Sequence, residues 1–326
     1  MDVFKVVVTD YTYETLDVER KVLSQIKNLE LCDYHYRTEE EVMQVTRDCD
    51  VLVVQYAPIT RRVIENLDRC RMIIRYAIGV DNIDLQAASE RGIYVVNVPD
   101  YGIDEVSTHT VCLILAAMRK LPQTIRDVRA GKWNYALVKP LRRTMGSTLG
   151  LIGLGRIPSS VAQKMAGFGM RILAYDPYVS QSHADALNVE LVDFDFLIRN
   201  SDCISIHCPL TAQTHHMFDI SVFQKMKPSA FLVNTARGAV IKEEDMITAC
   251  ETGLIAGAAI DVTEKEPVSA DSPLLLLDNV ILTPHIAWYT EESIVSLKQK
   301  LSEEIVRLAQ GKTPINVVNR ELLKAK

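Results

Sequence analysis

Several features are missing from this sequence of 326 residues, and each absence excludes a class of protein. Its seven cysteines form no Cys-X-X-Cys pair and no framework spacing, so reduced thiols in a cytoplasmic setting are the simplest interpretation. Lysine and arginine form no dense run, and the net charge is -6. Both facts argue against nucleic acid as the main partner, because phosphate binding needs clustered positive charge.

No segment has the pattern of a membrane anchor or an export signal. The first residues, Met1 to Lys5, lead directly into an expected strand and lack the basic and apolar regions of a signal peptide. The longest candidate for a membrane span, Val111 to Met118, is far shorter than a bilayer requires. We therefore expect a cytoplasmic protein with no membrane partner.

Neither an internal repeat nor a low-complexity tract interrupts the chain, and 48% of its residues are hydrophobic. This length and composition are enough for two domains, each with its own core. Short apolar runs rich in β-branched residues alternate with amphipathic stretches, a pattern typical of parallel sheets with crossover helices. The predicted fold class is α/β, with two doubly wound parallel sheets.

The first part of the chain predicts one small doubly wound domain. Buried strands are expected at 5–8, 50–54, 72–74 and 94–96. Helices are expected near 18–26, 38–48, 61–67 and 84–91. A long helix from about Asp104 to Lys120 then marks a change of pattern, between Gly102 and Pro122.

A second α/β run extends from Thr148 to about Pro284. Its six expected strands are 149–152, 172–175, 203–206, 230–234, 256–260 and 280–282, enough for a complete dinucleotide-binding sheet. A terminal helix follows, and its apolar stripe must bury against another element, for which the first domain is the expected place. The stripe consists of Ile294, Leu297, Leu301, Ile305 and Leu308.

A glycine-rich turn at 150–158 ends the first strand of the second run and opens a helix. Gly153 lets the chain turn, Gly155 lets its backbone approach a pyrophosphate, and the exposed N–H groups of the helix start attract phosphate. Pro158 stands where the fingerprint has a third glycine, which is acceptable in the first helical turn. An isolated turn of this kind often does no more than join a strand to a helix.

Asp176 ends the next strand at close to the spacing of about 20 residues expected for the acid that binds an adenosine ribose. Its charge would repel a 2′-phosphate, and no arginine follows at once, so the sequence favours NAD over NADP. The alternative is an ordinary helix cap.

Three charged residues in the second half of the chain each occupy a short motif of their own. They are Arg237 in Asn-Thr-Ala-Arg-Gly, Glu266 in Glu-Lys-Glu-Pro and His285 in Thr-Pro-His-Ile-Ala-Trp. Singly, such residues are mostly solvated or structural. Together they offer a cation for a carboxylate, a histidine for proton transfer and a carboxylate that tunes the histidine, which predicts chemistry on a 2-hydroxy or 2-oxo acid.

From the segment 79–84 to His285 the chain resembles the D-isomer-specific 2-hydroxyacid dehydrogenases. Through 231–238 and 284–289 it is most similar to the branch of the C-terminal binding protein corepressors, and phosphoglycerate dehydrogenases share much of the pattern. The resemblance implies a flavodoxin-like substrate domain at 1–98 plus 290–326. A Rossmann NAD domain at 99–289 would be inserted into it, and a homodimer would form largely through the NAD domains.

The resemblance also implies roles for particular residues. Arg237 would hold the substrate carboxylate and carbonyl oxygens, His285 would protonate the carbonyl oxygen, and Glu266 would fix the tautomer of His285. Asp261 would contact the nicotinamide amide. The full set of expected NAD-binding residues is Gly153, Gly155, Arg156, Ile157, Asp176, Cys208, Pro209, Thr214, Thr235, Ala236 and Asp261.

The expected substrate loop lies in the first domain. It is implied to bind substrate through Arg75, Ala77, Ile78 and Gly79. Ala77 stands where relatives usually have glycine, so approach to a carboxylate is expected to be looser there. Trp288 is expected either to form a wall over the substrate or to pack in the core.

Adjacent His215 and His216 lack a suitably spaced acidic or cysteine ligand, so we expect a surface loop and no metal. The expected function is an NAD-dependent oxidoreductase acting on a small D-2-hydroxy acid. One alternative is an NAD-sensing corepressor-like binding protein. The other is a short phosphoglycerate dehydrogenase, whose phosphate partners would be Arg75, Lys139, Arg142 or Arg143.

Overall fold

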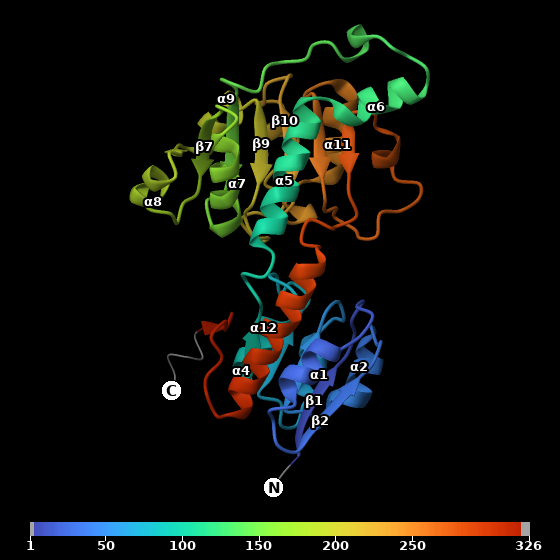
Figure 1. Ribbon diagram of the computed structural model, residues 1–326, viewed down its shortest axis with the longest axis vertical. Helices are drawn as coiled ribbons and strands as arrows, with labels where there is room; N and C mark the ends of the chain where they lie inside the picture. The colour runs from blue at the N-terminus through green and yellow to red at the C-terminus, as the bar shows by residue number, and fades with distance from the viewer. Residues whose placement is uncertain (1–2, 321–326) are drawn as a thin grey trace. The chain divides into compact units, whose positions relative to one another are not determined.

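The computed structural model describes residues 3–320 and divides into two compact units (Figure 1). Among the described residues, unit 1 comprises 3–102 and 290–320, and unit 2 comprises 103–289. The first boundary therefore falls after Gly102, where helix α5 (Ile103–Met118) begins, and not after residue 98. In unit 1 the two ends of the chain form one compact body, and unit 2 is continuous in sequence.

Unit 1 contains a five-stranded parallel sheet in the order β2-β1-β3-β4-β5, which is the flavodoxin-like order. The strands are β1 (Phe4–Val8), β2 (Leu29–Asp33), β3 (Val51–Val54), β4 (Met72–Arg75) and β5 (Tyr94–Val96). The sequence did not predict β2. This edge strand contains charged residues at Glu30 and Asp33, and none of its residues is fully buried, so it lacks the continuous apolar run that marks the other strands.

Five helices flank this sheet. They are α1 (Asp17–Leu23), α2 (Glu39–Thr46), α3 (Arg61–Glu65), α4 (Leu85–Glu90) and α12 (Glu291–Ala309). The C-terminal helix α12 packs against α1, as Figure 1 shows, and buries Leu297, Leu301 and Ile305 completely. The prediction that the terminal helix returns to the first domain is correct.

Unit 2 contains a seven-stranded parallel sheet in the order β12-β11-β10-β9-β6-β7-β8. The strands are β6 (Thr148–Ile152), β7 (Arg171–Tyr175), β8 (Glu190–Leu191), β9 (Cys203–Ile206), β10 (Phe231–Asn234), β11 (Gly257–Ile260) and β12 (Val280–Leu282). The six predicted strands are present, and β8 is an additional edge strand. The order reverses between β6 and β9, which is where open α/β sheets bind dinucleotides.

Helices cover both faces of this sheet. They are α5, α6 (Leu121–Arg129), α7 (Arg156–Ala166), α8 (Gln181–Ala186), α9 (Phe194–Asn200), α10 (Ile220–Phe223) and α11 (Glu243–Thr252), with short 3₁₀ turns η1 (Tyr135–Val138), η2 (Gly238–Val240) and η3 (Pro273–Leu276). Helix α5 ends at Met118 and does not reach residue 120, because Pro122 belongs to the first turn of α6. Within residues 3–320, no helix is long and apolar enough to cross a membrane.

Candidate functional site

The glycine turn directly follows strand β6. Gly153 adopts a positive φ of 94°, and its N–H donates to the carbonyl of Tyr175 at 2.8 Å. A Cβ at this position would lie 3.3 Å from the backbone carbonyl carbon of His207. Both the left-handed conformation and the close approach to the neighbouring chain favour glycine.

Gly155 precedes the first turn of α7, where it has no described atom within 4 Å of an added Cβ. The N–H groups of Arg156 and Ile157 lie in this first turn, and the partial positive charge of a helix start suits a phosphate. Pro158 is buried in the same turn, at a position where its missing N–H has no helical partner to lose. These features fit the pyrophosphate of a dinucleotide.

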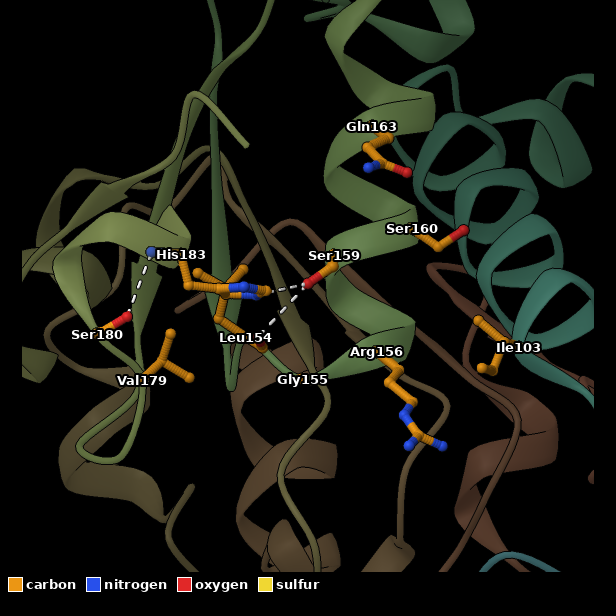
Figure 2. Close-up of a pocket in the computed structure, with 10 residues that line it drawn as sticks. All are labelled: Ile103, Leu154, Gly155, Arg156, Ser159, Ser160, Gln163, Val179, Ser180 and His183. Carbon is orange, nitrogen blue, oxygen red and sulfur yellow. Dashed lines mark hydrogen bonds between the residues drawn. The ribbon is translucent and has the colours of Figure 1, made fainter. Parts of the chain in front are cut away.

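A cavity of about 710 Å³ opens beside this helix start (Figure 2). In it, His183 Nε2 and Ser159 Oγ are 3.2 Å apart, and Ser180 Oγ accepts a hydrogen bond from the His183 N–H. The sequence analysis did not single out these three residues, since a histidine and two serines in helical segments carry no motif. The cavity is lined by Ile103, Leu154, Gly155, Arg156, Ser159, Ser160, Gln163, Val179, Ser180 and His183.

Asp176 follows β7 and uses both carboxylate oxygens locally. Oδ2 accepts the N–H of Leu154 at 2.8 Å, and Oδ1 accepts the N–H of Tyr178 at 2.9 Å. The residue therefore ties the glycine turn to the end of the neighbouring strand. Each oxygen retains capacity for a further hydrogen bond, so a ribose contact is compatible with this arrangement and stays a prediction.

His285 and Glu266 form a hydrogen-bonded pair. Glu266 Oε2 lies 2.7 Å from His285 Nδ1, while Glu266 Oε1 accepts the N–H of Thr263 at 3.2 Å. The two residues follow β11 and β12, which are parallel neighbours, so their loops emerge at the same edge of the sheet. His285 has a φ of 55°, in the left-handed region that few non-glycine residues occupy.

The environment keeps the Glu266 carboxyl in its charged form. Burial raises its pKa, but the hydrogen bond and charge of His285, the Thr263 N–H and the charge of Arg237 outweigh burial and lower the pKa below its ordinary value. With its Nδ1 directed to this carboxylate, His285 keeps Nε2 for another partner. The pair thus has the arrangement of a proton donor and its orienting carboxylate.

Arg237 lies in the turn after β10, next to β11 in the sheet. Asn234 shapes this turn, because its side chain donates to the Arg237 carbonyl at 2.9 Å and accepts the Ala236 N–H at 2.9 Å. One guanidinium nitrogen, Nη1, donates to the Ala236 carbonyl at 2.7 Å. The structure thus brings Arg237, Glu266 and His285 to one edge of the unit 2 sheet.

Asp261 is buried and organises the loop that carries His285. Its Oδ1 accepts hydrogen bonds from Thr283 Oγ1 at 2.5 Å and the Ile286 N–H at 3.0 Å, and its Oδ2 accepts the Ala287 N–H at 2.9 Å. His109 on α5 reaches the same place, with Nε2 3.2 Å from Thr283 Oγ1. The structure therefore gives Asp261 a positioning role, and its contact with the nicotinamide amide stays a prediction.

The remaining expected cofactor residues lie on two neighbouring loops at the same edge. In the loop after β9, Thr214 Oγ1 donates to the Pro209 carbonyl at 2.6 Å. Burial raises the pKa of the Cys208 thiol to about 11, which agrees with a packing residue and not a nucleophile. After β10, the hydroxyl of Thr235 lies 2.8 Å from that of Thr110, and Ala236 is held by Asn234.

The expected substrate loop lies in unit 1, directly after β4. The side chain of Arg75 serves this loop itself, since Nε donates to the Gln55 carbonyl at 2.9 Å and Nη1 to the Gly79 carbonyl at 2.9 Å. The carbonyls of Ala77 and Ile78 accept from the N–H of Val98 and the side chain of Asn97. By contrast, within the described residues the N–H groups of 77–79 make no hydrogen bond.

Trp288 lies in a turn of unit 2 close to His285. Its indole Nε1 donates to the His285 carbonyl at 2.9 Å, and its ring meets that of Tyr289 edge-on. The side chain is half-buried. This contact supports the His285 turn, while the expected wall over a substrate stays a prediction.

The basic residues Lys139, Arg142 and Arg143 lie before β6. Arg142 lines a cavity of about 430 Å³ with residues that directly precede strands, such as Asp202 and Ala256, so it lies at the amino edge of the sheet, opposite His285. In the part of the chain that the structure describes, no group of three or more His, Cys, Asp or Glu side chains could hold a metal ion.

Residues 111–287 match the sequence model described as "D-isomer specific 2-hydroxyacid dehydrogenase, NAD binding domain". The chain belongs to the D-isomer-specific 2-hydroxyacid dehydrogenase family. The predicted family, the two-sheet α/β fold and the NAD cofactor class are therefore confirmed. The resemblance to the corepressor branch stays a prediction.

Two members of the family illustrate the extent of similarity. The D-3-phosphoglycerate dehydrogenase of Archaeoglobus fulgidus is 41% identical over 281 residues, which cover 86% of this chain and 53% of that protein. The glyoxylate reductase of Korarchaeum cryptofilum is 38% identical over 293 residues, covering 89% and 88%. The chain thus spans about half the length of the first protein and most of the second.

Among solved structures, the chain is similar to a D-lactate dehydrogenase from Aquifex aeolicus complexed with NAD and lactic acid. The TM-score is 0.86 and the sequences are 28% identical, with 98% of each chain covered.

Neutralising Glu266 should change the pH dependence of turnover more than the substrate affinity. Because its pKa is lowered, the Glu266 carboxylate stays ionised until the pH falls below the ordinary range of a glutamate, so its negative charge supports His285 throughout the neutral range. In Glu266→Gln that support is lost, and the basic limb of the kcat/KM profile for 2-oxo acid reduction should move to lower pH. The profile should be unchanged in the control Glu303→Gln, which alters an exposed carboxylate of α12; equal profiles in all three proteins would contradict the pairing.

The expected preference for NADH over NADPH should depend on Asp176. NADH should bind clearly more tightly than NADPH. Asp176→Ala should lower the affinity for NADH by about tenfold or more, because a hydrogen bond to a charged group is lost. Asp176→Asn separates charge from hydrogen bonding, since the amide oxygen can still accept the Leu154 N–H. Fluorescence titration of both cofactors tests this; equal affinity in the unmodified protein would refute the preference.

Proposed function

We propose that this chain is an NAD-dependent oxidoreductase that interconverts a small D-2-hydroxy acid and its 2-oxo acid. The observation that carries the proposal is the contact of 2.7 Å between His285 Nδ1 and Glu266 Oε2, close to Arg237. An isolated surface ion pair would explain neither the left-handed backbone of His285 nor the convergence of three loops on one sheet edge. Family membership supports the same reaction class.

NADH, held at the glycine turn by the N–H groups of Arg156 and Ile157, would supply the hydride in the reductive direction, and the chain itself handles the substrate charge and the proton. Arg237 holds the carboxylate and polarises the carbonyl oxygen, because a guanidinium offers parallel donors in a fixed plane. His285 delivers a proton from Nε2 to that oxygen, while Glu266 holds the imidazole in one orientation and stabilises its charged form. In the oxidative direction, His285 takes the proton back.

The loop after β4 is proposed to hold the substrate carboxylate through backbone N–H groups. This proposal is supported by the N–H groups of 77–79, which make no hydrogen bond within the described residues, whereas the carbonyls of the same three residues are all bonded. Arg75 then acts as a brace for the loop. Ala77 has a backbone N–H as glycine would. The alanine therefore reduces the space at this position but leaves the number of N–H donors unchanged.

A short, unphosphorylated acid is the favoured substrate. Of the four candidate phosphate partners, Arg75 is engaged by its own loop, and Lys139, Arg142 and Arg143 precede β6, far along the chain from the loops of the catalytic candidates. A substrate phosphate therefore has no evident cation among them. The glyoxylate reductase, of which the chain covers the larger share, points in the same direction.

A panel of 2-oxo acids with NADH and NADPH tests the proposal directly. Glyoxylate, hydroxypyruvate and pyruvate should be reduced with a higher kcat/KM than phosphohydroxypyruvate. Preference for phosphohydroxypyruvate would favour the phosphoglycerate dehydrogenase alternative. If NADH binds but no 2-oxo acid is reduced, the proposal fails and an NAD-sensing binding protein takes its place.

The homodimer is proposed to form through the segment 121–145 of unit 2. Helix α6 leaves Leu121, Ile125 and Val128 exposed on one face, and the following segment leaves Trp133 at 88% and Tyr135 at 79% exposure. Several large apolar side chains exposed on one segment are typical of a protein interface. A second copy of the chain is its proposed occupant.

Replacing Trp133 and Tyr135 together with serine should convert the dimer to a monomer, because large aromatic side chains dominate interface energies. Analytical ultracentrifugation over a range of protein concentrations measures this. Ile315→Ser is a matched control, because Ile315 is an apolar side chain of unit 1 that is 67% exposed. A double variant with an unchanged sedimentation coefficient would exclude this segment as the interface.

A further inference from the structure

The adjacent histidines 215 and 216 lie at the end of the loop after β9 and differ sharply in their surroundings. His215 is exposed and stacks on His216, with ring centroids 3.8 Å apart. His216 has a φ of 53°, donates its N–H to the Ala239 carbonyl at 2.8 Å and places Nε2 2.9 Å from Glu264 Oε1. Only His216 therefore connects this loop to the segment that precedes Glu266.

Glu264 is also bound to the start of helix α11. The Glu243 N–H donates to Glu264 Oε1 at 2.9 Å, and the Glu264 N–H donates to Glu243 Oε2 at 3.1 Å. Glu264 Oε1 thus meets two segments at once: it accepts the Glu243 N–H of α11 and lies 2.9 Å from His216 Nε2. Because the backbone N–H of Glu264 is fixed as well, the chain on the amino side of Glu266 has little freedom.

The same segment fits closely against the turn that carries Arg237. A Cβ added to Gly238 would lie 2.0 Å from the carbonyl carbon of Thr263 and 2.5 Å from the Glu264 N–H nitrogen. The Thr263 N–H in turn donates to Glu266 Oε1 at 3.2 Å. The segment 263–264 therefore contacts both Glu266 and the turn that carries Arg237.

We propose that His216 is a positioning residue, which holds Glu266 in register with His285 through its contact with Glu264. The inference rests on the proposed function and adds a determinant to its active site. His216 contacts neither Glu266 nor His285 among the described interactions, so its effect is transmitted by Glu264 and the backbone of 263–265. The proposal requires a polar nitrogen beside Glu264 Oε1, at the position of Nε2.

The pair is poorly suited to stabilising the whole fold. Both side chains are 34% exposed, and ion pairs of this exposure contribute little to global stability. Its contribution is therefore expected in the geometry of the site and not in the melting temperature. This separates a positioning role from a structural one.

Three single variants of the full chain test the inference. His216→Ala removes the donor, His216→Gln retains an N–H donor at nearly the same place, and His215→Ala removes the stacked neighbour that does not contact Glu264. We expect kcat for the best 2-oxo acid to fall about fivefold in His216→Ala and less than about twofold in the other two, with melting temperature and NADH affinity preserved. The pH profile should also change in His216→Ala alone.

A second readout does not require turnover. The Nδ1–H proton of His285 should give a downfield NMR resonance through its short hydrogen bond to Glu266, and His285→Ala assigns it. This resonance should move or broaden in His216→Ala and persist in His216→Gln and His215→Ala. If the unmodified protein reduces no 2-oxo acid, the proposed function fails, while this comparison still decides the positioning role.

Two results would overturn the inference. One is an equal loss of kcat, or an equal change of the resonance, in His216→Ala and His215→Ala. The other is a loss confined to NADH affinity, which would place the effect of His216 in the cofactor loop. Failure of His216→Gln to restore kcat would equally exclude a role for the donor.

Discussion

Replacing His285 with alanine should abolish most reduction of 2-oxo acids and leave NADH binding nearly unchanged. Loss of a positioned general acid lowers a rate by about 10²–10⁴-fold, which is the expected fall in kcat. Among the described hydrogen bonds, the imidazole contacts Glu266 through Nδ1 and none of the expected NAD-binding residues. Steady-state kinetics and NADH titration on the same preparation measure the two quantities.

A second variant at position 285 is needed because of the backbone conformation there. At a φ of 55°, alanine is strained, whereas asparagine is among the residues that tolerate the left-handed region best. His285→Asn should therefore lose as much activity as His285→Ala while disturbing the turn less. His35→Ala, which changes an exposed histidine of unit 1, should behave as the unmodified protein. Full activity in His285→Asn would show that His285 is not the proton donor.

Replacing Arg237 with lysine should raise KM for a 2-oxo acid and lower kcat/KM. The loss corresponds to a hydrogen bond with a charged group, on the order of 1.5–3 kcal/mol, because lysine keeps the charge but cannot form the two-point contact. NADH affinity should hardly change. A 2-hydroxy acid that inhibits competitively should also bind more weakly to this variant, and an inhibition assay measures that affinity.

Arg142→Lys provides the matched control for this change, since Arg142 is an exposed arginine at the opposite edge of the same sheet. It should leave KM unaltered. An Arg237→Lys protein with unaltered KM and kcat would show that the guanidinium does not bind the substrate. A loss of NADH affinity as large as the loss of kcat/KM would show that Arg237 binds the cofactor and not the substrate.

The sequence was most informative where a residue pattern depends on local geometry. Parallel strands buried on both faces are continuous apolar runs, so β3, β9 and β10 were visible without a structure. Gly153 was also visible, because a tight turn between strand and helix demands a left-handed residue at a defined place. Edge strands β2 and β8 were not, because exposure breaks the apolar run.

The parts that could not be predicted depend on contacts between distant segments. Nothing in the sequence around Asp261 indicates that its carboxylate would hold the turn of His285, since both partners must first be brought together by β11 and β12. The same is true of His216 and Glu264. Gly238 carries no local signal either, because what excludes a side chain there is the backbone of Thr263.

The packing of α12 on α1 also bears on the order in which the protein can fold during synthesis. The partner of α1 is encoded at the far end of the chain, where Leu297, Leu301 and Ile305 complete the core of unit 1. Unit 2 is continuous from 103 to 289 and so has all of its strands once its last residue has left the ribosome. Unit 1 begins first but is completed last, and until then α1 lacks the helix that packs against it.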